Sequence, residues 1–156
     1  MSGASKPPGR VLFSCFPGCG HLHPLIPLAA AYRDAGWDVA VASGPELCPH
    51  VSRHGFPAFP IGLSAAETQR RYLDRHPGAD RLPPAQRLAM VAPGMFVEVA
   101  AACRARDLVA LVERWQPDLI VHDLAEFAAP LAGALAGVKH VTHGFGILNP
   151  DPQLLA

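Results

Sequence analysis

The sequence predicts a single α/β domain built on an open, doubly wound, Rossmann-like parallel sheet. Short, near-continuous apolar runs, such as residues 11–15, are typical of strands that are covered on both faces. Apolar residues at helical spacing follow them, as at Leu25, Leu28 and Tyr32. The chain has 156 residues, of which 50% are hydrophobic, so it is long enough to bury one core.

The first half of the chain predicts three strands joined by two helices. These elements are a strand at residues 11–15, a helix at 22–35, a strand at 38–42, a helix at 45–54 and a strand at 56–61. Gly36 and Gly55 follow the two helices, where glycine commonly ends a helix. Pro57 and Pro60 lie in the third strand, and because proline lacks a backbone donor we expect that strand at the sheet edge.

The second half predicts two more strands, at residues 119–122 and 139–142, each preceded by a helix. The first helix carries Leu108, Leu111, Val112 and Trp115 and stops before Pro117, and the second carries Leu124, Phe127, Ala128, Leu131 and Leu135 and stops at Gly137. An apolar stripe is the face that a helix turns to the core. Right-handed crossovers predict the strand order three, two, one, four, so strands one and four become neighbours.

Residues 62–94 separate the two halves and hold four prolines and five arginines. We expect this segment to be irregular. Insertions of this length in compact α/β domains are usually binding loops or mobile lids, and a solvated surface excursion is an equal alternative.

Composition excludes several classes of partner. The 13 Lys and Arg balance the 13 Asp and Glu, so nucleic acid and anionic membranes are not expected, and small neutral partners are favoured. No apolar run approaches the roughly 20 residues of a membrane span, and residues 11–16 are too short for a signal-peptide core. We expect a cytoplasmic protein without stable membrane insertion, in which the four scattered cysteines are reduced thiols.

The glycine-rich turn at residues 16–24 joins the first strand to the first helix, where open α/β sheets bind ligands. A dinucleotide fingerprint starting at Gly18 would need glycine where His23 stands, and no Gly-Lys-Ser/Thr follows for a P-loop. The histidines and cysteines here match no common zinc spacing, so we expect no metal. His23 is expected at the helix entry, and the histidines at 50, 54, 76, 140 and 143 on the surface or in packing rather than as catalysts.

His21 stands apart because Asp123 follows the fourth strand, the expected neighbour of the first. Adjacent strands lie about 4.8 Å apart, so the two side chains can face each other. A carboxylate that accepts from one imidazole nitrogen fixes the tautomer and leaves the other nitrogen as a base. Alternatively, Asp123 caps a helix that starts at Leu124, and the two roles are compatible if they use different oxygens.

These residues resemble the GT-B glycosyltransferases, especially the bacterial macrolide and natural-product type related to UDP-glycosyltransferases. The resemblance covers essentially the whole chain and rests on three motifs: Gly-His-Leu-His-Pro-Leu at 20–25 followed by Leu-Ala at 28–29, Gly-Trp-Asp-Val at 36–39, and Pro-Asp-Leu-Ile-Val-His-Asp at 117–123. The resemblance implies the N-terminal, acceptor-binding half of a GT-B fold. It also implies that His21 is the catalytic base, that Asp123 is its partner, and that residues 62–96 are the variable acceptor-binding or lid segment.

The resemblance further implies an inverting transfer of a sugar from a nucleotide donor to a hydroxyl of a small natural product, with no cofactor and no metal. Acceptor contacts are expected from Phe16, Pro17, Met90, Met95, Phe96 and His143, and donor-phosphate contacts from Gly18 and Gly20. We expect residues 1–156 to form one domain that lacks the C-terminal donor-binding domain. We therefore expect this domain to be inactive alone. Apolar surface left uncovered would favour a homo-oligomer. The alternative is a non-catalytic α/β module that binds a small molecule or a partner in the same crevice.

Overall fold

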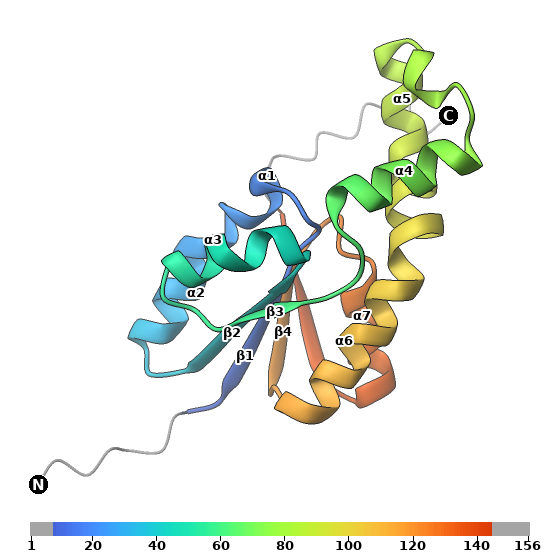
Figure 1. The fold of residues 1–156 in the computed structure, drawn as a ribbon. Helices are drawn as coiled ribbons and strands as arrows, with labels where there is room; N and C mark the ends of the chain where they lie inside the picture. Colours follow the sequence, from blue (N-terminus) through green and yellow to red (C-terminus); the bar gives the residue numbers. More distant parts are fainter. Residues whose placement is uncertain (1–7, 145–156) are drawn as a thin grey trace, which may run out of the picture.

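The computed structural model describes residues 8–144, which form a five-stranded parallel sheet in the order β3-β2-β1-β4-β5 (Figure 1). The predicted α/β class and the predicted order of the first four strands are confirmed. The strands are β1 Arg10–Ser14, β2 Asp38–Ser43, β3 Ala58–Pro60, β4 Leu119–Asp123 and β5 Lys139–His143. The third strand is shorter than its predicted range of 56–61 and lies at an edge, as its prolines predict.

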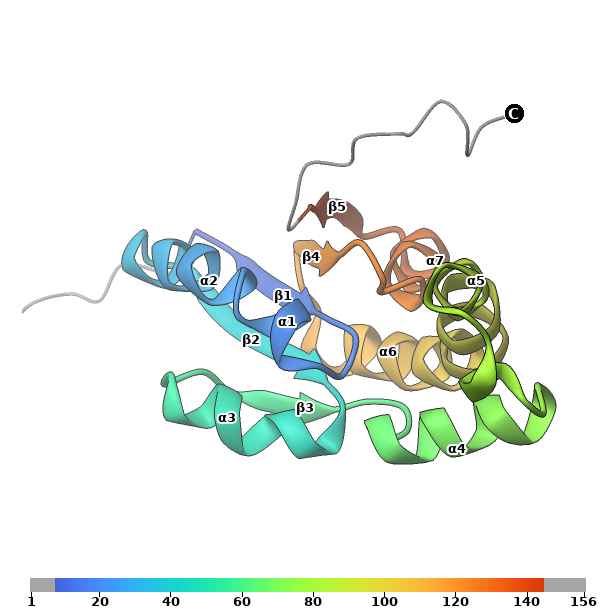
Figure 2. The same ribbon diagram turned by 90° about the horizontal axis from the view of Figure 1, so that it is seen from above.

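Helices cover both faces of the sheet, α2 and α3 on one side and α6 and α7 on the other (Figure 2). The α-helices are α1 Cys19–Leu22, α2 Leu25–Asp34, α3 Cys48–Arg53, α4 Ala65–Arg75, α5 Pro84–Met90, α6 Ala102–Trp115 and α7 Ala128–Ala136. Two short 3₁₀ helices, η1 Pro45–Leu47 and η2 Ala79–Arg81, and a π-helical segment, η3 Val91–Ala101, complete the elements.

The strand residues alternate between two apolar cores. Phe13, Val41 and Val121 pack with the residues of α2 and α3. The residues one position earlier or later, such as Leu12 and Ile120, pack with α6 and α7. Since successive side chains of a strand point to opposite faces, a run that is apolar throughout indicates a strand covered on both sides.

Central strand β1 pairs with β2 on one side and with β4 on the other. Ser14, its last residue, lies opposite Ala42 of β2 and His122 of β4. The segments that follow β1 and β4 therefore leave the sheet at the same edge, side by side. This register determines which functional side chains can meet.

The expectation that residues 62–94 are irregular is wrong, because most of the segment is helical. Ser64 caps α4 by accepting the amide N–H of Glu67 at 3.1 Å, and the Glu67 carboxylate pairs with Arg70 and Arg71 one turn later. Pro84 stands at the first turn of α5, where its missing N–H costs nothing. The prediction of an irregular segment rested on the number of prolines, but the position of each proline in a helix decides whether it disrupts that helix.

Pro93 lies inside the continuous helix, in the π-helical segment η3. A proline removes one helix hydrogen bond and crowds the carbonyl four residues earlier, and a wider helical turn is one way a chain accommodates that. Gly94 follows, and a Cβ there would lie 2.5 Å from the ring of Tyr72. Glycine at this position therefore permits η3 to pack closely on α4.

Helix α7 turns a different face to the core than its predicted stripe. Leu131 and Leu135 are 50% and 69% exposed, whereas Ala128, Ala129, Ala132 and Gly133 are buried. Because the helix is apolar on most of its surface, the spacing of its apolar residues does not indicate which face is buried. The small residues face the core because they allow the helix backbone to lie close to its neighbours. A Cβ on Gly133, for example, would lie 2.9 Å from the carbonyl oxygen of Val138.

One helical stretch, residues 84–115, is long and apolar enough by length and composition to cross a membrane. Its second half is a core helix of the domain, since Leu108, Leu111 and Val112 pack against the sheet. The core helix of a soluble domain satisfies the same criteria of length and composition.

Candidate active site

His21 and Asp123 meet at the carboxyl edge of the sheet. His21 lies on α1, just beyond β1, and Asp123 is the last residue of β4. The Nδ1 atom of His21 is 3.3 Å from Oδ1 of Asp123. The His21 side chain is 22% exposed and that of Asp123 is fully buried. The imidazole is therefore partly accessible to solvent, while the carboxylate beside it is shielded from water.

Two backbone amides hold the Asp123 carboxylate in place. Phe16 donates its N–H to Oδ2 at 2.8 Å, and Ala125 donates its N–H to Oδ1 at 2.6 Å. Helix α7 begins at Ala128, not at Leu124, so Asp123 shapes the preceding turn rather than capping that helix. Turn formation and pairing with His21 occur together, and both use Oδ1. The fixed carboxylate favours the imidazole tautomer that carries its proton on Nδ1 and its lone pair on Nε2.

Aromatic rings form a wall beside the imidazole. The ring centroids of Phe16 and Phe96 lie 5.6 Å and 6.1 Å from that of His21, and 4.5 Å from each other. Met95 packs against the same cluster. A Cβ on Gly18 would come within 3.1 Å of the imidazole, so glycine at this position leaves room for the ring. The wall would hold an apolar body next to a hydroxyl placed at His21.

The other predicted site residues are distributed more widely. Pro17 is buried against Gly44 in the same loop region, and Gly20 lies on α1, where a Cβ would meet open space. His143 ends β5 in register with Asp123, and its Nδ1 atom is buried without a partner among the residues that the structure describes. Met90 lines a hollow with His76 and Leu82, and neither His21 nor Asp123 is among the residues that line it.

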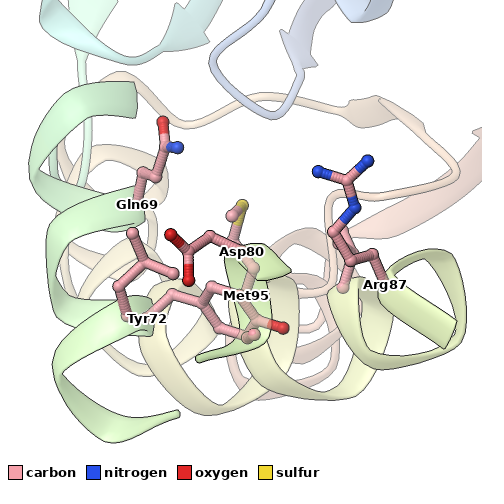
Figure 3. A pocket seen from close by; sticks show the side chains of 8 residues that line it. Gln69, Tyr72, Asp80, Arg87 and Met95 are labelled. Atoms are coloured by element: carbon pink, nitrogen blue, oxygen red, sulfur yellow. The ribbon is translucent and has the colours of Figure 1, made fainter. Parts of the chain in front are cut away.

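A cavity of about 150 Å³ lies in the helical segment that follows β3. Figure 3 shows Gln69, Tyr72, Asp80, Arg87 and Met95 around it, from α4, η2, α5 and η3. Met95 belongs to both apolar clusters, that of Phe16 and that of Tyr72. The cavity and the aromatic wall therefore share one side chain.

A buried ion pair that sequence reasoning missed lies beneath this site. Arg104 of α6 and Glu126, in the turn after β4, are each 2% exposed, and their side chains form charge-assisted hydrogen bonds. Burial opposes the charge of Arg104, but the neighbouring acidic groups, above all Glu126, outweigh this effect, so the pKa of the guanidinium is raised. The available signal was the position of Arg104, four residues before Leu108 on the apolar stripe of the helix.

The remaining histidines and cysteines do not form a metal site among residues 8–144. No group of three His, Cys, Asp or Glu side chains there could hold a metal ion. His23 and His50 contact each other through their Nε2 atoms, 3.1 Å apart on the surface. All four cysteines are free thiols, and burial raises the pKa of the Cys15 thiol to about 12.

Comparison with known proteins identifies the family to which this fold belongs. Residues 30–149 match the model described as erythromycin biosynthesis protein CIII-like, N-terminal domain. The chain belongs to this family. It is a glycosyltransferase N-terminal domain of the natural-product type, with the N-terminal GT-B fold. The match includes Asp123 and begins after His21.

Two curated relatives and one solved structure illustrate the similarity. L-demethylnoviosyl transferase of Streptomyces niveus is 36% identical over 93% of the chain, and tylactone mycaminosyltransferase of Streptomyces fradiae is 30% identical over 95%. The chain spans 37% of the length of each. The glycosyltransferase SsfS6 of Streptomyces sp. SF2575, solved also with thymidine diphosphate, is 27% identical with a TM-score of 0.75. That likeness covers 87% of this chain and 39% of the free structure, 38% of the complex.

Proposed function

We propose that this domain binds the acceptor in an inverting glycosyl transfer in which His21 is the general base. The observation that carries the proposal is the 3.3 Å contact between the partly exposed imidazole of His21 and the buried Asp123 carboxylate. In the proposed reaction, Nε2 of His21 takes the proton of an acceptor hydroxyl. The hydroxyl oxygen bonds to the anomeric carbon, and the bond from that carbon to the nucleoside diphosphate breaks.

Proton removal accompanies bond formation in this mechanism. A hydroxyl with a pKa near that of water, ~15.7, lies about nine units above an ordinary imidazole at ~6.5, so prior ionisation is out of reach. Asp123 would stabilise the imidazolium that forms, because its charge is held next to Nδ1 by two backbone donors. General-base assistance of this kind is usually worth about 10² to 10⁴ in rate.

The surroundings of His21 support an acceptor with an apolar body. Phe16, Phe96 and Met95 supply the wall next to the imidazole. We propose that residues 62–96 provide further acceptor contacts, and the cavity between α4 and η3 is the hollow in that segment that favours this role. Met90 and His143 remain proposed contacts, of which only His143 lies opposite Asp123 in the sheet.

The donor is proposed to be a sugar linked to a nucleoside diphosphate. Thymidine diphosphate bound to the SsfS6 glycosyltransferase supports this class. Gly18 and Gly20 are the proposed diphosphate contacts, next to His21 at the start of α1. Because the chain spans 37% of its curated relatives, we propose that most donor contacts come from the C-terminal part of a full-length protein.

The test is a comparison of the full-length protein with the 156-residue chain. Each is incubated with nucleoside diphosphate sugars and a panel of hydroxylated aglycones, and products are identified by mass spectrometry. NMR of the product gives its anomeric configuration. We expect transfer with inversion by the full-length protein and little or none by the 156 residues alone, because one loop cannot place a donor. Retention of configuration, or efficient transfer by the short chain, would refute the proposal.

A non-catalytic binding module would use the same crevice without needing a proton acceptor. Calorimetry separates the two functions. Acceptor binding by the full-length protein with no product from any donor would favour the binding module, whereas turnover excludes it.

A further inference from the structure

We propose that the buried ion pair of Arg104 and Glu126 is a positioning device that fixes the contact between His21 and Asp123. This inference rests on the proposed function of His21, since a positioning role needs a base to position. Neither residue of the pair contacts the imidazole in a hydrogen bond, so both would act through the backbone around it. Arg104 and Glu126 are therefore positioning residues rather than catalytic ones.

The Arg104 guanidinium connects three segments at the carboxyl edge of the sheet. Its Nε atom donates to Oε2 of Glu126 at 2.9 Å, and Nη2 donates to the same carboxylate. Nη2 also donates to the carbonyl of Cys15 at 2.7 Å, and Nη1 to the carbonyl of Ile61 at 3.2 Å. One planar group thus links the ends of β1 and β3 to the turn after β4.

The contact with Cys15 leads directly to Asp123. The Cys15 carbonyl and the Phe16 N–H belong to one peptide group. Arg104 binds its oxygen, and Asp123 accepts from its N–H at 2.8 Å. The peptide group therefore lies between a guanidinium and a carboxylate, each of which polarises it toward the other. Its N–H holds Oδ2 of Asp123 and so orients the carboxylate, whose other oxygen, Oδ1, contacts Nδ1 of His21.

Glu126 connects Arg104 back to Asp123. Its backbone N–H donates to the carbonyl of Asp123 at 3.2 Å, while its side chain holds Arg104. The same carboxylate accepts the Ser14 hydroxyl at 3.1 Å and the Ala128 N–H at 3.2 Å. Arg104, Glu126, Asp123 and the peptide group between Cys15 and Phe16 thus form a closed ring of hydrogen bonds.

Stability alone is a weak explanation for a buried pair of this kind. Taking two charges out of water is costly, and replacing a buried ion pair with apolar residues of similar volume is often neutral or stabilising. The charge of Arg104 also interacts favourably with both buried carboxylates nearby, that of Glu126 more strongly than that of Asp123. Its hydrogen bonds to Glu126 and to the Cys15 carbonyl therefore favour a role in holding the turn after β4 against the end of β1.

The test uses the full-length protein carrying the double substitution Arg104→Met with Glu126→Gln. This change removes both charges and approximately preserves volume, so no charge is left buried without a partner. Labelling with ¹⁵N-histidine allows the Nδ1 proton of His21 to be followed by NMR, assigned by its loss in His21→Gln. We expect the downfield signal of this hydrogen-bonded proton to move upfield or disappear, while the melting temperature stays within about 4 °C.

Kinetics supply the second readout. A displacement of a reacting group by about 1 Å can cost about 10²-fold in rate, so we expect kcat to fall by about that factor and the KM for the acceptor to change little. The matched control is Arg10→Met with Asp38→Asn, an exposed pair 3.8 Å apart at the opposite end of the same strands. The control should change neither the His21 signal nor kcat.

A second variant covers the case in which the double variant does not fold. Arg104→Lys keeps the charge but loses the planar fork that reaches Glu126 and the Cys15 carbonyl together. It should disturb the His21 signal and lower kcat as well. An unchanged signal and an unchanged kcat in either folded variant would overturn the positioning role.

Failure of this inference is distinguishable from failure of the proposed function. If His21→Ala removes activity while the Arg104 variants keep it, the positioning role is wrong and the function stands. If His21→Ala keeps full activity, the proposed function is wrong and the positioning role falls with it.

Discussion

Nδ1 of His21 and Oδ1 of Asp123 lie 3.3 Å apart although 102 positions separate the two residues in the sequence. The contact forms because β1 and β4 are neighbours in register, with Ser14 opposite His122. Asp123 ends β4 at the shared edge, and the chain after β1 needs only a short loop to bring His21 there. This contact makes the proposed base and its partner testable by substitution one residue at a time.

Substitution His21→Ala in the full-length protein should lower kcat by at least about 10²-fold and leave acceptor affinity within a few-fold. The substitution removes an interaction that stabilises mainly the transition state, in which the proton moves. The matched control is His23→Ala, an exposed histidine that contacts His50. Turnover kinetics and acceptor titration of both variants measure the effect, and an unchanged kcat in His21→Ala would remove this residue from the mechanism.

Asp123→Asn should lower both activity and stability. Both carboxylate oxygens accept backbone N–H groups, from Phe16 and Ala125, so an amide must direct its NH₂ group at one of these donors. A buried donor left without an acceptor costs about 1–3 kcal/mol. For a chain of this size, each ~1 kcal/mol lowers the melting temperature by about 2–4 °C. Asp38→Asn, on an exposed residue, is the control, and thermal melts that show no loss for Asp123→Asn would contradict the bonding described.

Exchange of the segment after β3 between relatives should change the preferred acceptor and leave the donor unchanged. The exchanged piece should extend from residue 62 to residue 101 rather than end at 96. The reason is that Arg75 donates to the carbonyl of Glu98 at 2.8 Å, and His76 pairs with the carboxylate of Glu98. A chimera joined at residue 96 would divide these contacts. Product analysis with paired donors and acceptors decides, and a donor preference that follows the exchange would place the acceptor pocket elsewhere.

Cys19 should react with iodoacetamide in the folded protein, whereas Cys15 should not. Cys19 is exposed on α1, two residues before His21. Cys15 is buried, and burial raises the pKa of its thiol to about 12, so almost no thiolate is present at neutral pH. Peptide mass spectrometry identifies the labelled thiols. Labelling should also reduce transfer by the full-length protein, and Cys19→Ser should protect it from this loss.

The free energy of unfolding should decrease as the pH falls below about 6.5, with a contribution from His122. Burial lowers the pKa of His122, so between its folded and unfolded values the unfolded chain binds a proton that the folded chain does not. This contribution is fully present above the unfolded value and is lost as the pH falls toward the folded one. Urea unfolding between pH 5 and 8 measures the slope, and His122→Asn should flatten it; equal slopes would contradict the assignment.

The sequence alone determined the sheet and the approximate place of the site. The apolar runs and the glycines and prolines that bound them are local features, and they placed β1, β2 and β4 to within one residue at each end. The handedness of crossovers then left few strand orders. Since parallel strands end at one edge, the positions of His21 and Asp123 in the sequence were enough to predict that they face each other.

Tertiary structure decided which faces are buried and which charges pair. Leu131 and Ala132 are both apolar, and only the space between α7 and its neighbours determined that the smaller side chain faces inward. Arg104 on a helical stripe is compatible with a surface position, and its partner Glu126 is contributed by a turn 22 residues away. The free energy of burying such groups depends on the hydrogen-bond partners that surround them in the folded structure. The sequence around each residue does not contain that information.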